Sequence, residues 1–560
     1  MFEVLKESLK PPTQQEQAEG TVKNNAGGYT FQTTNWQQLD RFLCMGITGG
    51  TYYVGEKELL KQNLEPVKAC IAEDAQRVLD RVVEISTQGR ALNNDAAIYA
   101  MALLCSQKGP GQRPGKNGTF SDVVCSTPVA LKAMELTPKT VRTFTGMAKF
   151  MTFIKRGRMR GFGRSFQRTL SNAWFKNRSV EDIVFSLIKY GSRYTFSQQD
   201  VYRILKPMNW TNHPDEARKG LYDYLFYFGE QRKAPTHPRL IAAEQISKVE
   251  TSAEAVKLMQ EHKLPFESVP TNLLDQSVYE MGIKNNHYEW LLRNLGNMSK
   301  QGLTKPFASG TNLILDKLLD KEALQKSKLH PMNVAKAMLQ YQKGKGHKGG
   351  NTWEVNQAIL SGLNEAFYNS FGNVVPTGKK ILVAIDVSGS MCASNAIIPE
   401  MADMPVLTAA AIVAMAITKT EKNFHIIGFD AIQRGLNGQL TSGIHDLGIH
   451  HTQRLDNIVD KLSSIRGGAT DCGLPFKWAI ENREVVDLFI VLTDSETWAG
   501  KTHVHEMLAE YRRRFNAKAK AINIAMVANR ATILPENPLN LEVIGFDAQV
   551  PKLINEFLNE

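Results

Sequence analysis

The sequence lacks the cysteine patterns that cross-link small secreted domains or hold structural zinc. Its 560 residues include only six cysteines, and no two of them form a Cys-x-x-Cys pair. This scarcity argues against a zinc ribbon or a disulfide framework and fits a reducing compartment. The six are Cys44, Cys70, Cys105, Cys125, Cys392 and Cys472.

Long apolar runs and a secretion signal are also missing. The longest apolar stretch, near Val406–Ile417, is too short to cross a bilayer. Residues 1–27 are polar and rich in glutamine, without the basic-then-apolar pattern of a signal peptide. We therefore expect a disordered polar tail over residues 1–27, no membrane association and a soluble, cytoplasmic protein.

Acidic residues are absent from Leu136–Val180, which contains 11 lysines and arginines and no aspartate or glutamate. A solvated helix face normally mixes both signs of charge, so this bias indicates a polyanion, and phosphate contacts would supply salt-sensitive affinity. A basic surface for an acidic protein partner is the alternative. The interleaved phenylalanines are expected mainly in the core. The basic residues are Lys139, Arg142, Lys149, Lys155, Arg156, Arg158, Arg160, Arg164, Arg168, Lys176 and Arg178.

The positive charge is confined to the first two thirds of the chain. The net charge is +11, yet residues 379–560 hold 18 basic and 21 acidic residues, a balance of −3. The remainder holds 49 basic and 35 acidic residues, a balance of +14. A polyanion is thus expected to bind the first domain only.

Apolar periodicity divides the chain in two. Helical spacing recurs from about Glu56 to Phe371, broken by Gly, Pro or Asn, which predicts a helical-repeat domain over residues 28–378. Strand and helix patterns alternate afterwards, which predicts a doubly wound α/β domain over residues 379–560. The predicted strands are Ile381–Asp386, Phe424–Phe429, Asp487–Thr493, Ala519–Ala525 and Leu541–Ile544.

Oxygen-bearing side chains follow two of these strands. Asp386, Ser388 and Ser390 are spaced two apart, so an extended backbone would point them to one side. Asp494 ends another strand, and the Gly-rich loop 467–471 offers Thr470. Oxygen ligands with little charge suit a hard divalent cation, Mg²⁺ above all.

This constellation resembles the metal-ion-dependent adhesion site of von Willebrand factor A domains. Its Asp-x-Ser-x-Ser motif matches Asp386, Ser388 and Ser390, and the resemblance carries the family's distal ligands onto Thr470 and Asp494. With a basic helical domain in front, the chain resembles the sixty-kilodalton Ro ribonucleoprotein family, whose helical half is the TROVE module. The matching stretches include Asp40-Arg-Phe-Leu-Cys-Met45, Gly49-Gly-Thr-Tyr-Tyr53, Trp290-Leu-Leu-Arg-Asn-Leu-Gly-Asn-Met298 and Thr493-Asp-Ser-Glu-Thr-Trp498.

The resemblance implies a ring of HEAT-like helical repeats closed by the A-like domain, in a monomeric protein that binds RNA rather than catalyses a reaction. Small noncoding Y RNAs would bind the outer basic surface, and single-stranded ends of misfolded RNAs would enter a basic central hole. Lys189 and Arg193 correspond to family positions that contact Y RNA. The expected RNA-binding residues are Lys139, Arg142, Lys155, Arg156, Arg158, Arg160, Arg164, Arg168, Lys189 and Arg193.

Two other functions are compatible with parts of the pattern. A protein-interaction scaffold could use the metal site to dock a partner's carboxylate, and this could coexist with RNA binding. A Mg²⁺-dependent phosphoryl-transfer enzyme could use Asp386 as nucleophile. That chemistry usually places a second aspartate two residues later, where this chain has Ser388, and no Walker loop or Gly-x-Ser-x-Gly elbow is present. The enzyme interpretation is therefore disfavoured.

Overall fold

The structure is a computed structural model of the 560-residue chain, described here for most of its length. Arg158, Arg160 and Arg193 lie outside the described residues, as does the side chain of Arg156. The described residues are 13–45, 56–91, 93–105, 126–156, 162–190, 196–207, 210–227, 231, 233–305, 308–327, 329–346, 350–370, 377–393, 397–398, 404–418, 421–432, 442–450, 453–465, 467–545, 547 and 550–559.

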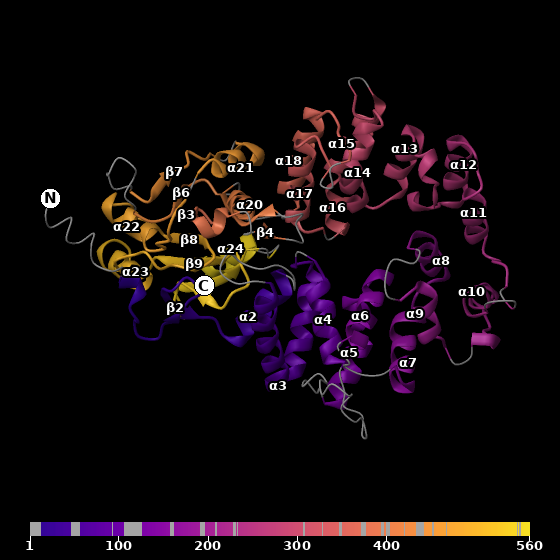
Figure 1. The fold of residues 1–560 in the computed structure, drawn as a ribbon, viewed down its shortest axis with the longest axis horizontal. Coiled ribbons are helices and arrows are strands. Elements are labelled where there is room, and N and C mark those ends of the chain that lie inside the picture. Colours follow the sequence, from indigo (N-terminus) through magenta and orange to yellow (C-terminus); the bar gives the residue numbers. More distant parts are fainter. Residues whose placement is uncertain are drawn as a thin grey trace.

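Helices of the first region form a curved array that leaves the sheet domain and returns to it (Figure 1). One row leads away from the sheet and comprises α2 (Asn35–Met45), α3 (Glu56–Gln88), α4 (Asp95–Leu104), α5 (Thr127–Thr140), α6 (Phe144–Arg156), α7 (Arg164–Leu170), the π-helical turn Ser171–Phe175, α8 (Val180–Lys189) and α9 (Gln198–Ile204). The far end holds α10 (Glu216–Phe226), α11 (Pro238–Ile246) and α12 (Ser252–His262). The returning row comprises α13 (Gln276–Asn285), α14 (Tyr288–Lys300), α15 (Ser309–Leu319), α16 (Lys321–Ser327), α17 (Pro331–Gln342) and α18 (Gln357–Asn369).

Most predicted helices are present, and one break between them has a clear local cause. The sequence predicts separate helices over Pro66–Ala72 and Gln76–Ser86, which the structure joins in α3 across a non-helical residue, Asp74 (φ −151°, ψ 87°). The Asp74 carboxylate accepts a hydrogen bond from the Arg77 backbone N–H at 2.9 Å. It therefore caps the second segment as an N-cap aspartate does and satisfies one of its free donors.

The second region is a six-stranded sheet in the order β11-β9-β8-β3-β6-β7. Neighbouring strands run parallel except for β7, which pairs antiparallel with β6. The strands are β3 (Ile381–Asp386), β6 (Phe424–Phe429), β7 (Ile444–Asp446), β8 (Leu488–Thr493), β9 (Lys520–Ala525) and β11 (Asn540–Ile544). The helices are α19 (Gly389–Cys392), α20 (Val406–Thr418), α21 (Leu455–Ser463), α22 (Leu474–Glu481), α23 (Val504–Arg514) and α24 (Val550–Asn559).

The two faces of this sheet are covered by different helices. Alternate residues of β3 enter different cores, because successive side chains of a strand point to opposite faces. Val383 packs in a core with α20, α21 and α24 that continues into the helical region, and Leu382 packs in a second core with α22 and α23. The sheet is thus doubly wound, as the sequence predicts, and one of its cores extends into the helical region.

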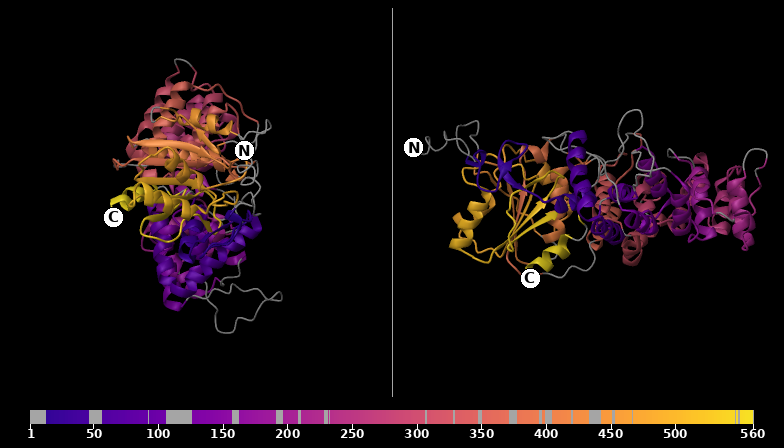
Figure 2. Two further views of the ribbon diagram at one scale, coloured as in Figure 1. Left: turned by 90° about the vertical axis from the view of Figure 1, so that its left-hand side faces the viewer. Right: turned by 90° about the horizontal axis from the view of Figure 1, so that it is seen from below.

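The N-terminal segment corrects one prediction. Residues 13–27, which belong to the expected disordered tail over residues 1–27, are ordered, and residues 1–12 lie outside the described residues. We call residues 13–32 the N-terminal strap; it contains a 3-10 turn (Thr13–Gln15), β1 (Val22–Lys23) and β2 (Tyr29–Gln32). β2 pairs antiparallel with β1 and with β10 (Ala531–Thr532), so the N-terminal strap joins the sheet domain (Figure 2). The polar composition of the strap does not predict this order, because its side chains form hydrogen bonds with residues far away in the sequence.

Candidate functional site

The structure brings four of the five predicted metal ligands to one edge of the sheet. β3 and β8 are adjacent and parallel, so Asp386 and Asp494 meet at their carboxyl ends. The Asp386 carboxylate accepts hydrogen bonds from the Thr493 hydroxyl (2.6 Å) and the Ser388 N–H (2.9 Å). The Ser388 and Ser390 hydroxyl oxygens lie 3.1 Å apart. The four predicted residues are all buried.

The fifth predicted ligand, Thr470, lies on the neighbouring Gly-rich loop and is also buried. This loop is fastened to the residues after β3, because the Gly389 N–H donates to the Gly468 carbonyl at 2.8 Å. Gly467 approaches so closely that a Cβ atom there would lie 1.5 Å from the Val387 carbonyl oxygen. Only glycine permits this contact between the two loops.

Burial and mutual repulsion disfavour negative charge on these carboxylates. Exclusion of water, followed by the nearby charge of Asp494, raises the pKa of Asp386 to about 7. Loss of hydration also raises the pKa of Asp494. Two buried carboxylates beside two serine hydroxyls form a set of oxygen donors that a hard cation would neutralise and bridge. The residues therefore fit a divalent cation. Among the described residues, no group of three or more His, Cys, Asp or Glu side chains is placed to hold a metal, so the predicted site depends on its hydroxyl groups.

Two carboxylates near this edge were missed by the sequence analysis as site residues. Asp430 follows β6, the strand on the other side of β3, and its carboxylate accepts a hydrogen bond from the Gly468 N–H at 3.3 Å. Glu496 is buried, and its pKa is raised to about 7 by exclusion of water and then by Asp494. The position of Asp430 directly after a predicted strand was an available signal. Glu496 lies two residues after the predicted ligand Asp494, in a stretch that matches the family, but the sequence does not pair it with Asn25 or Asn529, which lie more than 30 residues away.

The predicted RNA-binding residues differ in how they are placed. Lys139, Arg142, Lys155, Arg164 and Arg168 are exposed. Arg164 and Arg168 lie one turn apart on α7, and neither forms an ion pair with a described acidic residue. These two side chains are therefore available for phosphate groups.

Exposed Arg142 and buried Lys189 form internal contacts. The Arg142 guanidinium donates to the Ser86 carbonyl at 2.9 Å and to the Lys139 carbonyl at 3.0 Å, which joins α3 to the α5–α6 turn. Lys189 ends α8 with only 8% of its side chain exposed, and its ammonium lies 3.9 Å from Glu267. The structure thus places Lys189 away from the open surface.

Aromatic side chains of the basic stretch mostly fill the core, as predicted. Phe144, Phe150, Phe166 and Phe175 are buried, whereas Phe162 is half-buried. The Trp174 indole N–H donates to the Val141 carbonyl at 2.7 Å, so this ring is also fixed internally. The basic groups then lie over an apolar interior rather than beside an open row of stacking rings.

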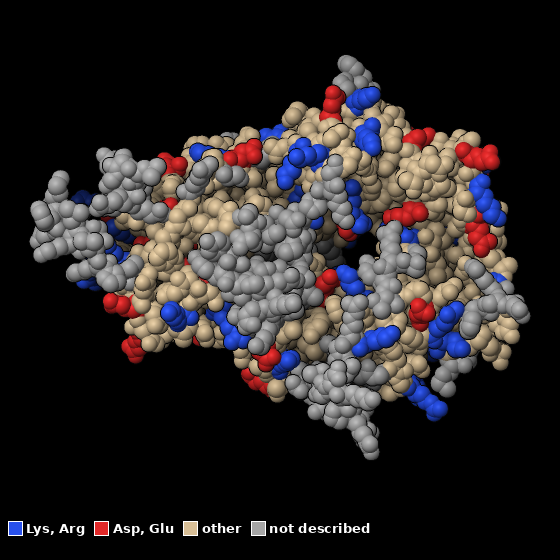
Figure 3. Space-filling model, viewed as in Figure 1, with Lys and Arg blue, Asp and Glu red and all other residues tan. Residues whose placement is uncertain are grey.

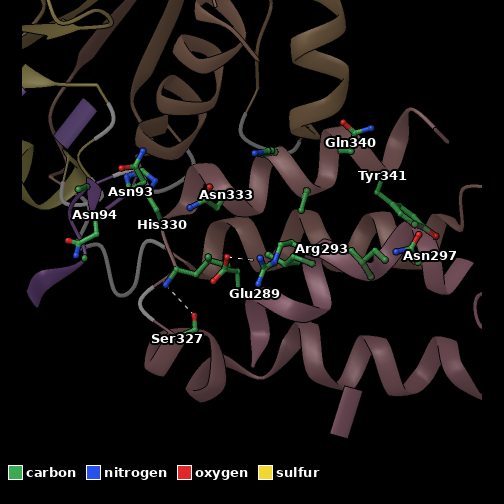
Figure 4. A pocket seen from close by; sticks show the side chains of 18 of the residues that line it. Asn93, Asn94, Glu289, Arg293, Asn297, Ser327, His330, Asn333, Gln340 and Tyr341 are labelled. Carbon is green, nitrogen blue, oxygen red and sulfur yellow. Dashed lines mark hydrogen bonds and ion pairs between the residues drawn. The ribbon is translucent and has the colours of Figure 1, made fainter. Parts of the chain in front are cut away.

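An opening passes between the two rows of helices, with lysine and arginine side chains and some acidic ones around its visible rim (Figure 3). A cavity of about 740 Å³ lies between the rows and is lined from both of them. Asn93 and Arg142 come from the outgoing row, and Arg293, Asn297 and Lys336 come from the returning row. Figure 4 shows Asn93, Arg293 and Asn297 among the lining side chains. Its lining therefore combines cationic groups, the carboxylate of Glu289 at 3.8 Å from the Arg293 guanidinium, and carboxamides that can both donate and accept hydrogen bonds.

Comparison with known proteins places the chain in a family. The family model described as the TROVE domain matches residues 22–264, and the one described as the Ro60 vWA domain matches residues 380–558. A Deinococcus radiodurans protein named RNA-binding protein RO60 is 31% identical over 555 residues, which cover 98% of this chain and 97% of that protein. The chain belongs to the Ro60 family.

A second relative and a solved structure agree with this assignment. A Caenorhabditis elegans protein, also named RNA-binding protein RO60, is 26% identical over 620 residues, covering 99% of this chain and 92% of that protein. The crystal structure of the Deinococcus radiodurans RO (RSR) protein superposes with a TM-score of 0.67 at 28% identity, covering 94% of this chain and 99% of that one. The predicted Ro60-type fold, a helical region followed by an A-like sheet domain, is confirmed. No helix among the described residues is long and apolar enough to span a membrane.

Proposed function

We propose that this chain binds RNA as the protein subunit of a ribonucleoprotein particle in the cytoplasm. The observation that carries the proposal is the exposed basic surface around α6 and α7, in a stretch of 45 residues with no acidic side chain. Ro60 relatives are named RNA-binding proteins, which supports the same ligand. In this proposal the protein positions and protects RNA and performs no chemistry on it.

Two kinds of RNA would bind at different places on the protein. Small noncoding Y-type RNAs would bind the outer basic surface, where phosphate contacts need only exposed cations. A single-stranded end of a misfolded RNA would enter the opening between the helix rows. Its wall offers the Arg293 guanidinium to phosphates and the Asn297 carboxamide to base edges (Figure 4). This division suits quality control, since only unpaired ends would fit inside.

Charge reversal on α7 tests RNA binding. Replacing Arg164 and Arg168 by glutamate is expected to weaken binding of a structured RNA with a free single-stranded 3′ end by roughly 10- to 100-fold at about 0.1 M salt, because phosphate contacts are lost and repulsion replaces them. The slope of log affinity against log salt should fall by about 1.4 to 1.8, from about 0.7 to 0.9 for each contact. Filter binding across a salt series measures both quantities.

A matched control carries the same charge change elsewhere. Arg514 and Lys552 are exposed residues of the sheet domain, each paired with a glutamate one turn away. The Arg514→Glu, Lys552→Glu variant should leave RNA affinity nearly unchanged. Equal losses for the two double variants, or an affinity that does not respond to salt, would contradict binding through α7.

A second function, supported by the buried oxygen donors at β3 and β8, is metal-dependent docking of a protein partner. A cation held by Asp386, Ser388, Ser390, Thr470 and Asp494, with Mg²⁺ favoured, would accept a carboxylate from the partner as a further ligand. Partner capture from native cells should then survive nuclease treatment and disappear on chelation. Capture that is lost with nuclease and unaffected by chelation would assign the association to RNA instead.

A further inference from the structure

The N-terminal strap contacts both loops that carry the distal metal ligands. On the first loop, the Glu496 carboxylate lies two residues after Asp494 and accepts three hydrogen bonds from the strap. They come from the Asn25 N–H (2.8 Å), the Asn25 side-chain amide (2.7 Å) and the Ala26 N–H (3.1 Å). The Asn529 side-chain amide joins the same cluster, donating to Glu496 at 2.9 Å and to the Asp494 carbonyl at 2.7 Å. The strap is therefore bonded to the loop beside a predicted ligand.

The second loop is held by a different part of the strap. The Gln14 side-chain amide donates to the carboxylate of Asp471 at 2.9 Å, one residue after Thr470. Its carbonyl oxygen accepts from the Thr497 hydroxyl at 2.5 Å, and Gln14 is fully buried. Gln14 thus bridges the loop of Thr470 and the loop of Asp494. Each of these two predicted ligands is close in sequence to a residue that forms a hydrogen bond with the strap.

Glycines permit this close approach. A Cβ atom on Gly28 would lie 2.0 Å from the Thr497 carbonyl oxygen, and one on Gly500 would lie 2.1 Å from the Gln14 amide nitrogen. Real Cβ atoms do not approach neighbouring atoms this closely, so a larger residue at either position would displace the strap. The contact is specific to this arrangement of strap and loops.

A cation and the strap would therefore order the same two loops. A ligand that binds loops already ordered by another ligand loses less conformational entropy on binding, and the resulting coupling is reciprocal. We propose that docking of the N-terminal strap and occupancy of the divalent-cation site are coupled, with Gln14 and Asn25 acting as positioning residues for the loops of Thr470 and Asp494. This inference rests on the proposed metal site and adds a regulatory element to it.

Calorimetric titration with Mn²⁺ and amide hydrogen exchange with and without Mg²⁺ test the coupling on the full chain. Asn25→Ala should weaken Mn²⁺ binding at least about threefold, and Gly28→Ala about tenfold, within the usual range of coupling between sites. Saturating Mg²⁺ should slow exchange of the Asn25 and Ala26 amide protons by a similar factor. Asn25 is exposed, so its replacement is expected to leave the fold intact.

Gln17→Ala is the matched control. Gln17 is an exposed residue of the same strap, and among the described residues its side-chain amide donates within the strap, to the Thr21 carbonyl at 3.1 Å. Its replacement should leave Mn²⁺ affinity unchanged. Unchanged affinity in both Asn25→Ala and Gly28→Ala, with normal binding by the wild type, would overturn the coupling and leave the metal site standing. No binding by the wild type would overturn both, while RNA affinity, measured separately, would remain a test of the main function.

Discussion

Replacing Asp386 and Ser388 together by alanine is expected to abolish binding of Mg²⁺ and Mn²⁺ to the full chain. The change removes one of two buried carboxylates and one of two neighbouring serine hydroxyls, leaving Ser390, Thr470 and Asp494. A hard cation with so few protein oxygens keeps most of its water, so affinity should fall at least about 100-fold. Isothermal titration calorimetry with Mn²⁺ measures the loss directly.

Two companion variants separate loss of the ligand from loss of the fold. Asp386→Asn keeps the size of the side chain and its acceptor for the Thr493 hydroxyl, and should also weaken Mn²⁺ binding at least about tenfold, since a charged oxygen ligand is replaced by a neutral one. Asp446→Ala removes an exposed carboxylate of β7 and should leave binding unchanged. Mn²⁺ binding by the Asp386→Ala, Ser388→Ala variant with the same heat and affinity as the wild type would show that the assigned ligands are wrong.

The sheet domain was predictable nearly to the residue. Buried parallel strands are continuous apolar runs, and β3 (Ile381–Asp386) and β6 (Phe424–Phe429) have the predicted bounds. β7 was missed because Ile444–Asp446 is short, polar and only half-buried to exposed. The predicted metal ligands were identified by the spacing of Asp386, Ser388 and Ser390 and by the family resemblance, which added Thr470 and Asp494; Asp386 and Asp494 meet because the carboxyl ends of neighbouring parallel strands share one edge.

The docking of the N-terminal strap on the sheet domain was not predictable, because it depends on polar contacts between distant parts of the chain. The strap appears featureless in composition, yet Gln14 bonds to Asp471 and Asn25 bonds to Glu496, each more than 450 residues away. Local propensity carries no information about such pairs. The prediction of disorder was wrong for residues 13–27 for this physical reason.

The basic stretch was predicted in its chemistry but not in the role of each residue. Charge bias identifies a surface for polyanions, and Arg164 and Arg168 match that expectation by their exposure. A guanidinium can equally donate to free carbonyl groups at helix ends, as Arg142 does, and an ammonium can be covered by packing, as in Lys189. Arg142 is itself exposed, so its hydrogen-bond partners, and in Lys189 the burial, distinguish these cases; both are properties of the fold.

A second large effect is expected where the first helix of the array meets the sheet domain. Arg41 on α2 is fully buried, forms an ion pair with Glu542 on β11, and donates to the carbonyls of Asn529 (2.5 Å) and Ala531 (3.1 Å). Arg41→Met should lower the free energy of unfolding by about 3 kcal/mol, because a buried carboxylate then loses its charged partner. Urea titration followed by far-ultraviolet circular dichroism measures this change.

The expected loss in the free energy of unfolding lies at the lower end of the range for broken buried ion pairs, because the Glu542 carboxylate keeps other hydrogen-bond donors. The Asn523 side-chain amide and the Thr532 hydroxyl still donate to its carboxylate, at 2.8 and 2.6 Å. Glu542→Gln in the Arg41→Met background should therefore recover part of the stability, since it removes the unpaired charge. Arg77→Ala is the control, because Arg77 is exposed over the Trp36 ring and should cost at most about 1 kcal/mol. Equal losses in the free energy of unfolding for Arg41→Met and Arg77→Ala would mean that the buried ion pair does not hold α2 to the sheet. Apolar packing alone would then join the helical array to the sheet domain.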